Sequence, residues 1–234
     1  MVEPRRLAGQ NIRRLAAKRR FKAMGSFISA GLIIVAPVIL FKILENFLKQ
    51  TFLLTSKVQF SLFQFSAFIF PILFILVALG LAFNGVYLWQ QADRADRGAK
   101  GEEDVAKEME PLERESWQIE YGMLLAGRLG DADILCISPQ SRAYVVDVKS
   151  HRGEVIMDGN QLSRRMGKAT YKFEKDFLEC SMKQALQVKK QKGLNFVTPI
   201  VVFSDAKVSV TAGKHRGVHV VEKLRLVSLL RSLG

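Results

Sequence analysis

The sequence predicts two membrane-spanning helices followed by an α/β domain with a central mixed sheet. Two uncharged stretches of 19 residues each, 23–41 and 65–83, lie within the first 90 residues. Residues 98–234 instead alternate helix-like and strand-like runs, and they carry 22 basic and 18 acidic residues. A domain of that length can bury a hydrophobic core of its own. The two parts of the chain are therefore treated separately.

Each uncharged stretch is close to the roughly 20 residues that a helix needs to cross a bilayer. Pro37 and Pro71 lie inside the stretches, and transmembrane helices tolerate such prolines with a kink. Lys42 directly follows the first stretch and Trp89 follows the second, as is typical of the membrane interface. We expect a transmembrane hairpin over residues 23–90. The alternatives are core helices of a soluble protein or, for the first stretch, a cleaved signal peptide.

The N-terminal arm, residues 1–22, holds eight basic residues and one acid. Lys and Arg are retained on the cytoplasmic side of membranes, so we expect both termini and the C-terminal domain in the cytoplasm and the connection 43–64 outside. The arm supplies about half of the net charge of +13. Membrane topology and attraction to anionic lipids account for this charge, so it does not by itself indicate nucleic-acid binding. An interfacial amphipathic helix and a DNA-binding arm are the other interpretations. The predicted location is the cell (inner) membrane, as a multi-pass protein.

Residues 91–97 (QADRADR) are predicted to form a short charged linker to the C-terminal domain, residues 98–234. Residues 98–112 have helical spacing with acids near the start, which the helix dipole favours. Turn residues then separate runs that read as strands. The expected strands are 118–128, 132–138 and 142–149, with 154–157 as an extension.

The second part of this domain returns to helix and then to strand. Residues 161–175 show no pattern that assigns them. Helical spacing follows at 176–192 and is stopped by Gly193. The remaining expected elements are a buried strand at 196–203, short strands at 208–210 and 218–221, and a closing helix at 222–233. This order requires a mixed sheet with helices on its faces.

The strand 142–149 places opposite charges on one side. Asp147 and Lys149 are two positions apart and share a face, whereas Val146 and Val148 share the other. An unpaired charge on a buried strand is costly, so these side chains need a partner. The alternative is an exposed pair of little energetic value at a sheet edge.

The preceding strand supplies such a partner. Asp131 and Asp133 have the same spacing there, and a tight turn would place that strand antiparallel to 142–149. Carboxylates from adjacent strands repel one another unless a cation lies between them, and oxygen ligands suit Mg²⁺ or Mn²⁺. Lys149 would then stabilise an anionic phosphate or hold the attacking water. Asp131 is also interpretable as a turn residue.

The sequence gives no support to several other chemistries. It lacks a GxxxxGK[ST] phosphate loop, a GxSxG nucleophile elbow and any paired Cys or Cys/His array. Cys136 and Cys180 belong to no recognisable motif, and we expect both to be small buried hydrophobes. We therefore expect neither a P-loop nucleotide hydrolase, nor a serine hydrolase, nor a zinc site.

The ordered set of these residues resembles the nuclease-related domain (NERD), a branch of the PD-(D/E)xK phosphodiesterase superfamily. The resemblance covers roughly residues 98–225 and implies a restriction-endonuclease-like αβββαβ fold. NERD domains also occur attached to membrane-spanning segments, in agreement with the first half of the chain. The motifs are Gly98-x-x-Gly101-Glu102, Asp133-Ile134-Leu135, Asp147-Val148-Lys149 followed by Gly153, and Gln184-Ala185.

The resemblance implies a role for each of these polar residues. Asp133 and Asp147 would bind Mg²⁺ or Mn²⁺, together with the main-chain carbonyl of Val148. Lys149 would orient or deprotonate the attacking water. Glu102 would support the ligands or bind a second metal ion, and Gln184 would contact a metal-bound water or the phosphate.

Three departures from the family pattern bear on these roles. Asp147 stands where the family more often has Glu, so the carboxylate is drawn inward. Glu103 is adjacent to Glu102, so the helix assignment shifts by one if Glu103 is the functional acid. Ile134 follows the first Asp where the family often has His, which removes a substrate contact. Glu102 as a helix-start acid and Gln184 as a surface residue remain alternatives.

Basic residues downstream of the acids are candidates for tracking phosphates. These are Arg152, Arg164, Arg165 and Lys168. The resulting hypothesis is a membrane-anchored, Mg²⁺- or Mn²⁺-dependent nuclease acting on nucleic acid, with DNA the expected substrate. The alternative is a weakly active or inactive NERD domain that serves as a membrane-tethered module binding nucleic acid or a partner.

Overall fold

The computed structural model describes residues 7–51, 57–127 and 129–234. Predictions that involve residues 1–6, including Arg5 and Arg6 of the basic arm, the connecting residues 52–56, and Arg128 lie outside the described residues. The chain divides into two compact units. The helical unit is Leu15–Arg94, and the α/β unit combines Met1–Arg14 with Ala95–Gly234.

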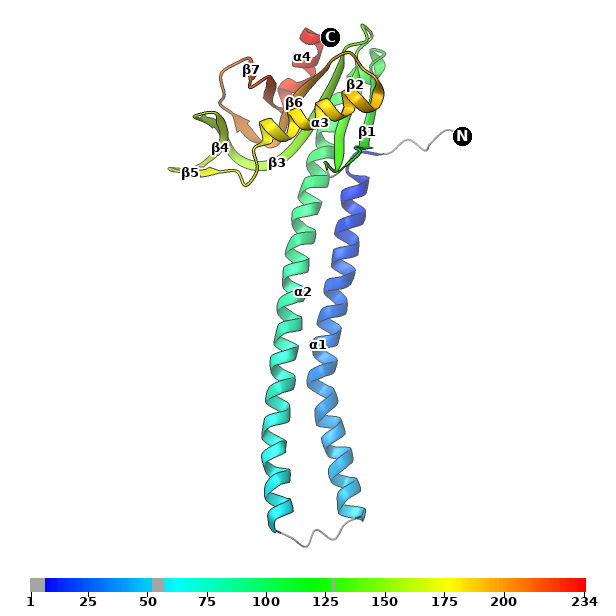
Figure 1. Cartoon of the computed structure of the whole chain (residues 1–234), viewed down its shortest axis with the longest axis vertical. Coiled ribbons are helices and arrows are strands. Elements are labelled where there is room, and N and C mark those ends of the chain that lie inside the picture. The colour runs from blue at the N-terminus through cyan, green and yellow to red at the C-terminus, as the bar shows by residue number, and fades with distance from the viewer. Residues whose placement is uncertain (1–6, 52–56, 128) are drawn as a thin grey trace, which may run out of the picture. The chain divides into compact units, whose positions relative to one another are not determined.

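The chain begins with two long helices, α1 (Gln10–Thr51) and α2 (Lys57–Arg114) (Figure 1). Their parts within Leu15–Arg94 form the helical unit. They pack through small residues that recur every seven positions and so return to the same face every two turns. Each of these residues is buried: Ala16, Ala23 and Ala30 in α1, and Ala78, Gly85 and Ala92 in α2. A Cβ on Gly85 would lie 2.7 Å from the Phe27 ring, so the absent side chain is what permits this close contact.

Polar contacts also join the two helices of this unit. Asn84 donates a hydrogen bond to the Ser26 hydroxyl at 3.0 Å. Arg20 donates to Asp93 at 3.1 Å and also lies over the Trp89 ring. These contacts fix the register that the small residues allow.

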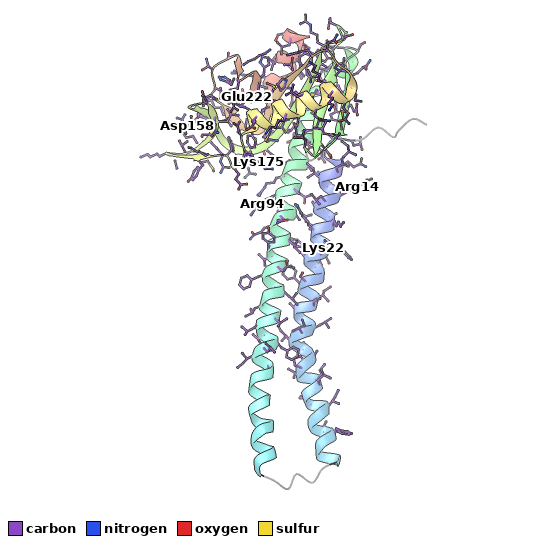
Figure 2. All side chains as sticks on the ribbon, in the orientation of Figure 1. Arg14, Lys22, Arg94, Asp158, Lys175 and Glu222 are labelled. Atoms are coloured by element: carbon purple, nitrogen blue, oxygen red, sulfur yellow. The ribbon has the colours of Figure 1, made fainter. Side chains whose placement is uncertain are left out.

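Large apolar side chains cover the outside of both helices, as the sticks in Figure 2 show. Within the described residues, two helical segments are long and apolar enough to cross a membrane, Gln10–Leu40 and Pro71–Arg114, each with a mean hydropathy of 2.2 in its most apolar window. The predicted spans 23–41 and 65–83 both fall within continuous helix, and neither Pro37 nor Pro71 interrupts it.

The α/β unit is built on a mixed sheet of eight strands in the described chain (Figure 1). The strand order is β1-β2-β3-β6-β8-β7, and β4 and β5 form a hairpin that pairs with β3. β6 runs parallel to both β3 and β8, and the other pairings are antiparallel. The strands are β1 (Gln118–Leu124), β2 (Asp131–Ile137), β3 (Ala143–Asp158), β4 (Gln161–Met166), β5 (Ala169–Lys172), β6 (Val197–Val208), β7 (Lys214–His215) and β8 (Val218–Glu222).

Helices cover both faces of this sheet. Val146 and Val148 face a core that also contains residues of α2 and of α4 (Lys223–Leu233), such as Met109 and Leu226. The opposite face packs against α3 (Phe177–Lys192), and Phe203 of β6 lies with Phe177 in a separate core there. The predicted alternation of β3 is therefore observed, and the α/β fold class with a mixed sheet and two long apolar N-terminal helices is confirmed.

Several predicted boundaries differ from the structure. Residues 91–97 and 98–112 were predicted as a linker and a separate helix, but α2 runs through both without interruption. The segment QADRADR contains no Gly or Pro to stop a helix, and its charges suit an exposed helical surface. The first strand ends at Leu124 rather than at 128, where Gly127 and Gly130 turn the chain with positive φ.

The second half of the sheet is longer than predicted. The runs 142–149 and 154–157 belong to the single strand β3, whose pairing with β6 shifts register between Lys149 and Arg152. The unassigned residues 161–175 contain the β4–β5 hairpin, and β6 extends to Val208 in place of a separate strand at 208–210. The hairpin gave no sequence signal because it is mostly exposed and lacks a periodic apolar face.

Candidate active site

Pairing of β2 with β3 brings two predicted acids together. The strands are antiparallel with Ile134 opposite Val146, so Asp133 and Asp147 are the next residues along the pair and project from the same face. Asp133 Oδ2 accepts a hydrogen bond from the Val148 N–H at 2.7 Å. Asp147 is only 2% exposed. The carboxylates thus converge where the strand spacing predicts.

Lys149 lies directly against these oxygens. Its Nζ is 2.5 Å from Asp147 Oδ1 and 3.4 Å from the main-chain carbonyl oxygen of Val148. The ammonium also lies 5.3 Å from the centre of the Phe177 ring of α3. A cation is therefore held by two of the three oxygens that the resemblance assigns to metal binding.

Glu102 reaches the same cluster because α2 approaches the sheet closely. A Cβ on Gly101 would lie 2.8 Å from Ser204 Oγ and 3.0 Å from Ser150 Cβ, so only glycine permits this approach. Glu102 is 8% exposed and interacts electrostatically with Lys149, Asp131 and Asp147. The neighbouring Glu103 instead forms a two-pronged ion pair with Arg13 at 2.5 and 2.7 Å. Glu102 is thus the acid of this pair that faces the cluster.

The electrostatics of the cluster reflect burial and mutual repulsion. Burial raises the pKa of Glu102 to about 7, against the opposing effects of the Gly9 N–H and Lys149. Burial also raises the pKa of Asp133 well above its usual range, and the charge of Asp147 adds to this shift. For Lys149, burial lowers the pKa, but the charges of Asp147 and Asp133 outweigh it and the net shift is upward. Binding of a cation would lower the pKa of both carboxyl groups, Glu102 and Asp133, by stabilising their charged forms.

Gln184 enters from α3, which begins after the N-cap residue Asp176. Its Nε2 donates to the main-chain carbonyl of Asp131 at 3.3 Å. Its Oε1 is buried and has no hydrogen-bond partner in the described structure. Gln184 therefore lies beside the start of β2 and offers one unused acceptor.

A divalent cation fits the chemistry of these donors. Asp147 Oδ2 is also buried without a hydrogen-bond partner among the described residues, so the cluster has spare oxygen acceptors. Across the described chain, no group of three His, Cys, Asp or Glu side chains is placed to hold a metal ion. Mg²⁺ commonly uses one or two carboxylates and completes its shell with water or substrate oxygens. Asp133, Asp147 and the Val148 carbonyl meet that smaller requirement.

The predicted phosphate-contacting residues lie on β3 and on the β4–β5 hairpin. Arg164 packs over the Tyr171 ring at 6.0 Å, and Arg165 forms an ion pair with Glu154 at 2.6 Å. Arg152 and Lys168 are exposed. Arg164 thus presents its charge beside an exposed aromatic ring, whereas part of the charge of Arg165 is neutralised by Glu154.

His151, which flanks the site in sequence, belongs to an aromatic cluster. Its ring centre is 4.9 Å from that of Phe173 and 5.5 Å from that of Phe177. Burial lowers its pKa, and Arg164 and Lys149 lower it further. The neutral imidazole is therefore favoured at His151, which lies on β3 two residues after Lys149.

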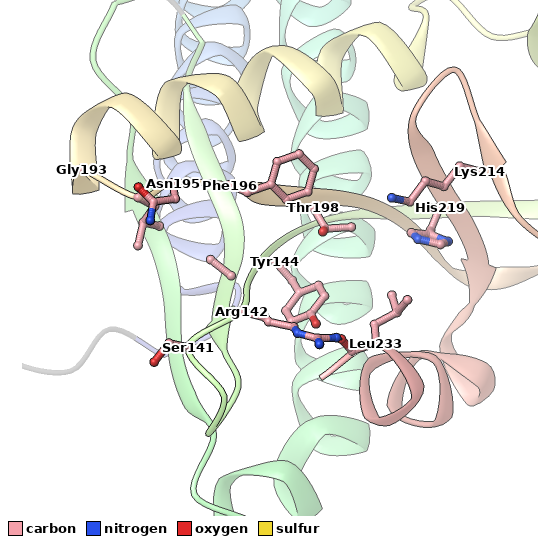
Figure 3. Close-up of a pocket in the computed structure, with 12 residues that line it drawn as sticks. Ser141, Arg142, Tyr144, Gly193, Asn195, Phe196, Thr198, Lys214, His219 and Leu233 are labelled. Carbon is pink, nitrogen blue, oxygen red and sulfur yellow. The ribbon is translucent and has the colours of Figure 1, made fainter.

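A cavity at another part of the sheet has different chemistry. It has a volume of about 530 Å³ and is lined at the start of β3 and β6 by Tyr144 and Thr198, with Lys214 and His219 opposite (Figure 3). No predicted site residue lines it, and its lining contains no acidic side chain within the described residues. Arg142 at its wall donates to the Leu233 carbonyl at 2.5 Å. The described lining of this cavity therefore lacks the carboxylates that a divalent cation prefers.

The N-terminal arm makes three contacts that the sequence analysis missed, two to acids of the cluster and one to the adjacent Glu103. Gly9 N–H donates to Glu102 Oε2 at 3.0 Å, Asn11 Nδ2 donates to Asp131 Oδ2 at 3.1 Å, and Arg13 pairs with Glu103. The arm was assigned from sequence to membrane topology, to the membrane interface or to DNA, and none of these interpretations predicts a contact with the acidic cluster. No local pattern reveals a contact between residues 93 positions apart.

These observations define a mixed α/β domain with a buried acidic centre. Residues 97–204 match the profile of the family described as the nuclease-related domain, NERD. The chain therefore contains a nuclease-related domain, and the resemblance drawn from the motifs is confirmed. All five candidate catalytic residues lie inside the matched range. Comparisons with curated proteins and with solved structures give no match.

Proposed function

We propose that this protein is a membrane-anchored, divalent-metal-dependent nuclease that hydrolyses phosphodiester bonds in nucleic acid, with DNA as the expected substrate. The observation that carries the proposal is the position of Lys149, whose ammonium lies against Asp147 and the Val148 carbonyl beside Asp133. Charge-paired acids and a lysine on adjacent strands are the groups that metal-assisted phosphodiester hydrolysis uses.

Each residue of the cluster has a proposed task. Asp133, Asp147 and the Val148 carbonyl would hold Mg²⁺ or Mn²⁺, which when bound would polarise the phosphate and acidify a water. Lys149 is protonated, so its ammonium orients the water or donates to a phosphate oxygen. Glu102 and Gln184 flank the cluster from α2 and α3 and would hold water molecules in place.

The substrate would approach over the β4–β5 hairpin. Arg152, Arg164, Arg165 and Lys168 would contact phosphates there, and the exposed Tyr171 offers a surface on which a base can stack. Such contacts depend strongly on salt, because each phosphate contact releases counterions.

The two apolar helices would anchor the domain in the cell (inner) membrane as a multi-pass protein. The basic arm favours a cytoplasmic position for both termini, so the nuclease-related domain would meet cytoplasmic nucleic acid. The length and hydropathy of α1 and α2 support the membrane anchor, and the basic arm supports its orientation.

A second candidate function is a membrane-tethered module that binds nucleic acid or a partner without cleaving it. The burial of Asp147 and Glu102 favours this alternative, because a substrate must reach these acids before it can be cut.

Cleavage assays on the full chain in detergent micelles would test the proposal. The protein is incubated with plasmid DNA, linear DNA or RNA in the presence of Mg²⁺, Mn²⁺ or a chelator. Asp147→Asn and Asp133→Asn should each lower cleavage by more than about 100-fold, because each removes a charge that the metal needs. Asp205→Asn, at an exposed aspartate of the same sheet, is the matched control and should retain activity.

Two results would contradict the proposal. Cleavage that survives both Asn substitutions would place the chemistry elsewhere. A folded wild-type chain that binds nucleic acid with a steep salt dependence yet cuts nothing with either metal would support the binding module instead.

A further inference from the structure

We infer that residues 7–14 form a cover over the acidic cluster, and that this N-terminal cover must leave before metal and substrate reach Glu102 and Asp133. The inference rests on the proposed function only for the identity of the ligand. The cover itself is defined by contacts within the α/β unit, to which these residues belong.

The main chain of the cover makes a buried contact to the cluster. Gly9 N–H donates to Glu102 Oε2 at 3.0 Å, and this hydrogen bond is buried. Gly9 has φ of +70°, and a Cβ there would lie 2.8 Å from the carbonyl oxygen of Ala99. Both the conformation and the space therefore require glycine at this position. The cover is seated directly on α2 next to the predicted catalytic acid.

Two side chains that follow Gly9 make further contacts to acidic residues. Asn11 donates to Asp131 Oδ2 at 3.1 Å, at the start of β2. Arg13 binds both carboxylate oxygens of Glu103, at 2.5 and 2.7 Å. All three contacts are made to acids of the elements that carry the cluster.

The space left under the cover is too small for substrate. A cavity of about 40 Å³ lies between the cover and the cluster, with lining residues that include Leu7, Gly9, Glu102 and Asp133. One water molecule occupies about 30 Å³ in the liquid. A hydrated metal ion or a phosphodiester group is larger than this cavity. The cover therefore excludes both from this side of the cluster.

The cover is also held weakly enough to leave. The Arg13 and Glu103 side chains are 53% and 31% exposed, and exposed ion pairs are weak and screened by salt. The Asn11 contact is exposed as well. A ligand that binds only the open form has an affinity reduced by the fraction of molecules that are open. Loosening the cover should therefore tighten binding.

Variants of the full chain in detergent micelles would test this inference. Gly9→Ala should unseat the cover through a backbone clash, and Gly25→Ala, which meets nothing within 4 Å in α1, is its control. Arg13→Glu should weaken the cover by charge reversal, and Arg13→Glu combined with Glu103→Arg should restore it. Arg14→Glu makes the same charge change at the next residue, which is exposed.

Three quantities are measured on each variant. They are hydrogen exchange of peptides from residues 7–14, Mn²⁺ affinity by electron paramagnetic resonance, and Mn²⁺-dependent cleavage of DNA. We expect Gly9→Ala to raise exchange and to tighten Mn²⁺ binding about tenfold, in line with the strain of a non-glycine residue at positive φ. Arg13→Glu should tighten binding about two- to fivefold. The double variant and both controls should match wild type.

The outcomes separate this inference from the proposed function. Faster exchange with unchanged or weaker Mn²⁺ binding would overturn the cover and make residues 7–14 a structural support of Glu102. Tighter Mn²⁺ binding without any cleavage would uphold the cover and reject the nuclease. Equal cleavage by wild type and by Gly9→Ala, with equal Mn²⁺ affinity, would uphold the nuclease and reject the cover.

Discussion

Gly101 shows how one missing side chain positions an acidic centre. A Cβ at this position would meet Ser204 Oγ at 2.8 Å and Ser150 Cβ at 3.0 Å, so Gly101→Ala should push α2 away from the sheet. Overpacking of this kind costs about 1–3 kcal/mol. We expect a lower melting temperature for the full chain in micelles, measured by circular dichroism, and a displaced Glu102.

The same helix provides the control for Gly101. A Cβ on Gly98 would be 4.0 Å from Ile12, which is ordinary contact. Gly98→Ala should therefore be neutral or should stabilise the helix by up to about 1 kcal/mol. Equal melting temperatures for the two alanine variants would contradict the role given to Gly101.

We expect His219 to make the stability of the domain sensitive to acid. The residue is 8% exposed, and its Nε2 has no hydrogen-bond partner in the part of the chain that the structure describes. Burial lowers its pKa, and Lys214 lowers it further. The unfolded chain therefore takes up a proton at higher pH than the folded chain does, so stability falls as the pH drops below about 6.5.

Replacing this histidine should reduce that loss. The stability of His219→Gln, measured by thermal unfolding at pH 7 and pH 5, should change less between the two pH values than that of wild type. His215→Gln alters a less buried histidine of the same β7–β8 pair and serves as the control. If His219→Gln retained the full pH dependence of wild type, a group other than His219 would control it.

The spacing of small residues determines how α1 and α2 pack against each other in the helical unit. Ala23 is 0% exposed, so Ala23→Leu should force the helices apart and destabilise the hairpin by about 1–3 kcal/mol. Gly25→Leu, where nothing lies within 4 Å, should leave the packing intact. Thermal unfolding in micelles, followed by loss of helical circular dichroism, measures both. A smaller effect at Ala23 than at Gly25 would reject the packing seam.

For the whole molecule, the distribution of charge predicts the topology. With eight basic residues in the first 22, both termini should be cytoplasmic. A green fluorescent protein fused after Gly234 should therefore fluoresce, while alkaline phosphatase fused at the same point should be inactive. Active phosphatase would place the nuclease-related domain outside the cytoplasm and remove its proposed access to nucleic acid.

The candidate cluster illustrates how far sequence reasoning reaches. The sequence predicts that one site contains Asp133, Asp147 and Lys149, because strand alternation and one tight turn determine which side chains share a face. Glu102 was assigned to this site only through the family resemblance, because the sequence does not specify where a helix packs along a sheet. Only the tertiary structure distinguishes Glu102 from Glu103. The close approach at Gly101 places Glu102 against the cluster, whereas Glu103 pairs with Arg13.

The amino-acid sequence alone determined the two long apolar helices, the α/β class of the domain and the pairing of the acids on β2 and β3. Each of these depends on periodicity or on a short turn, which neighbouring residues specify. Only the tertiary structure decided that residues 7–14 lie over Glu102, that α2 continues through the expected linker, and that residues 161–172 form a hairpin. Those features depend on contacts between distant segments or on exposed strands, for which neighbouring residues carry no periodic signal.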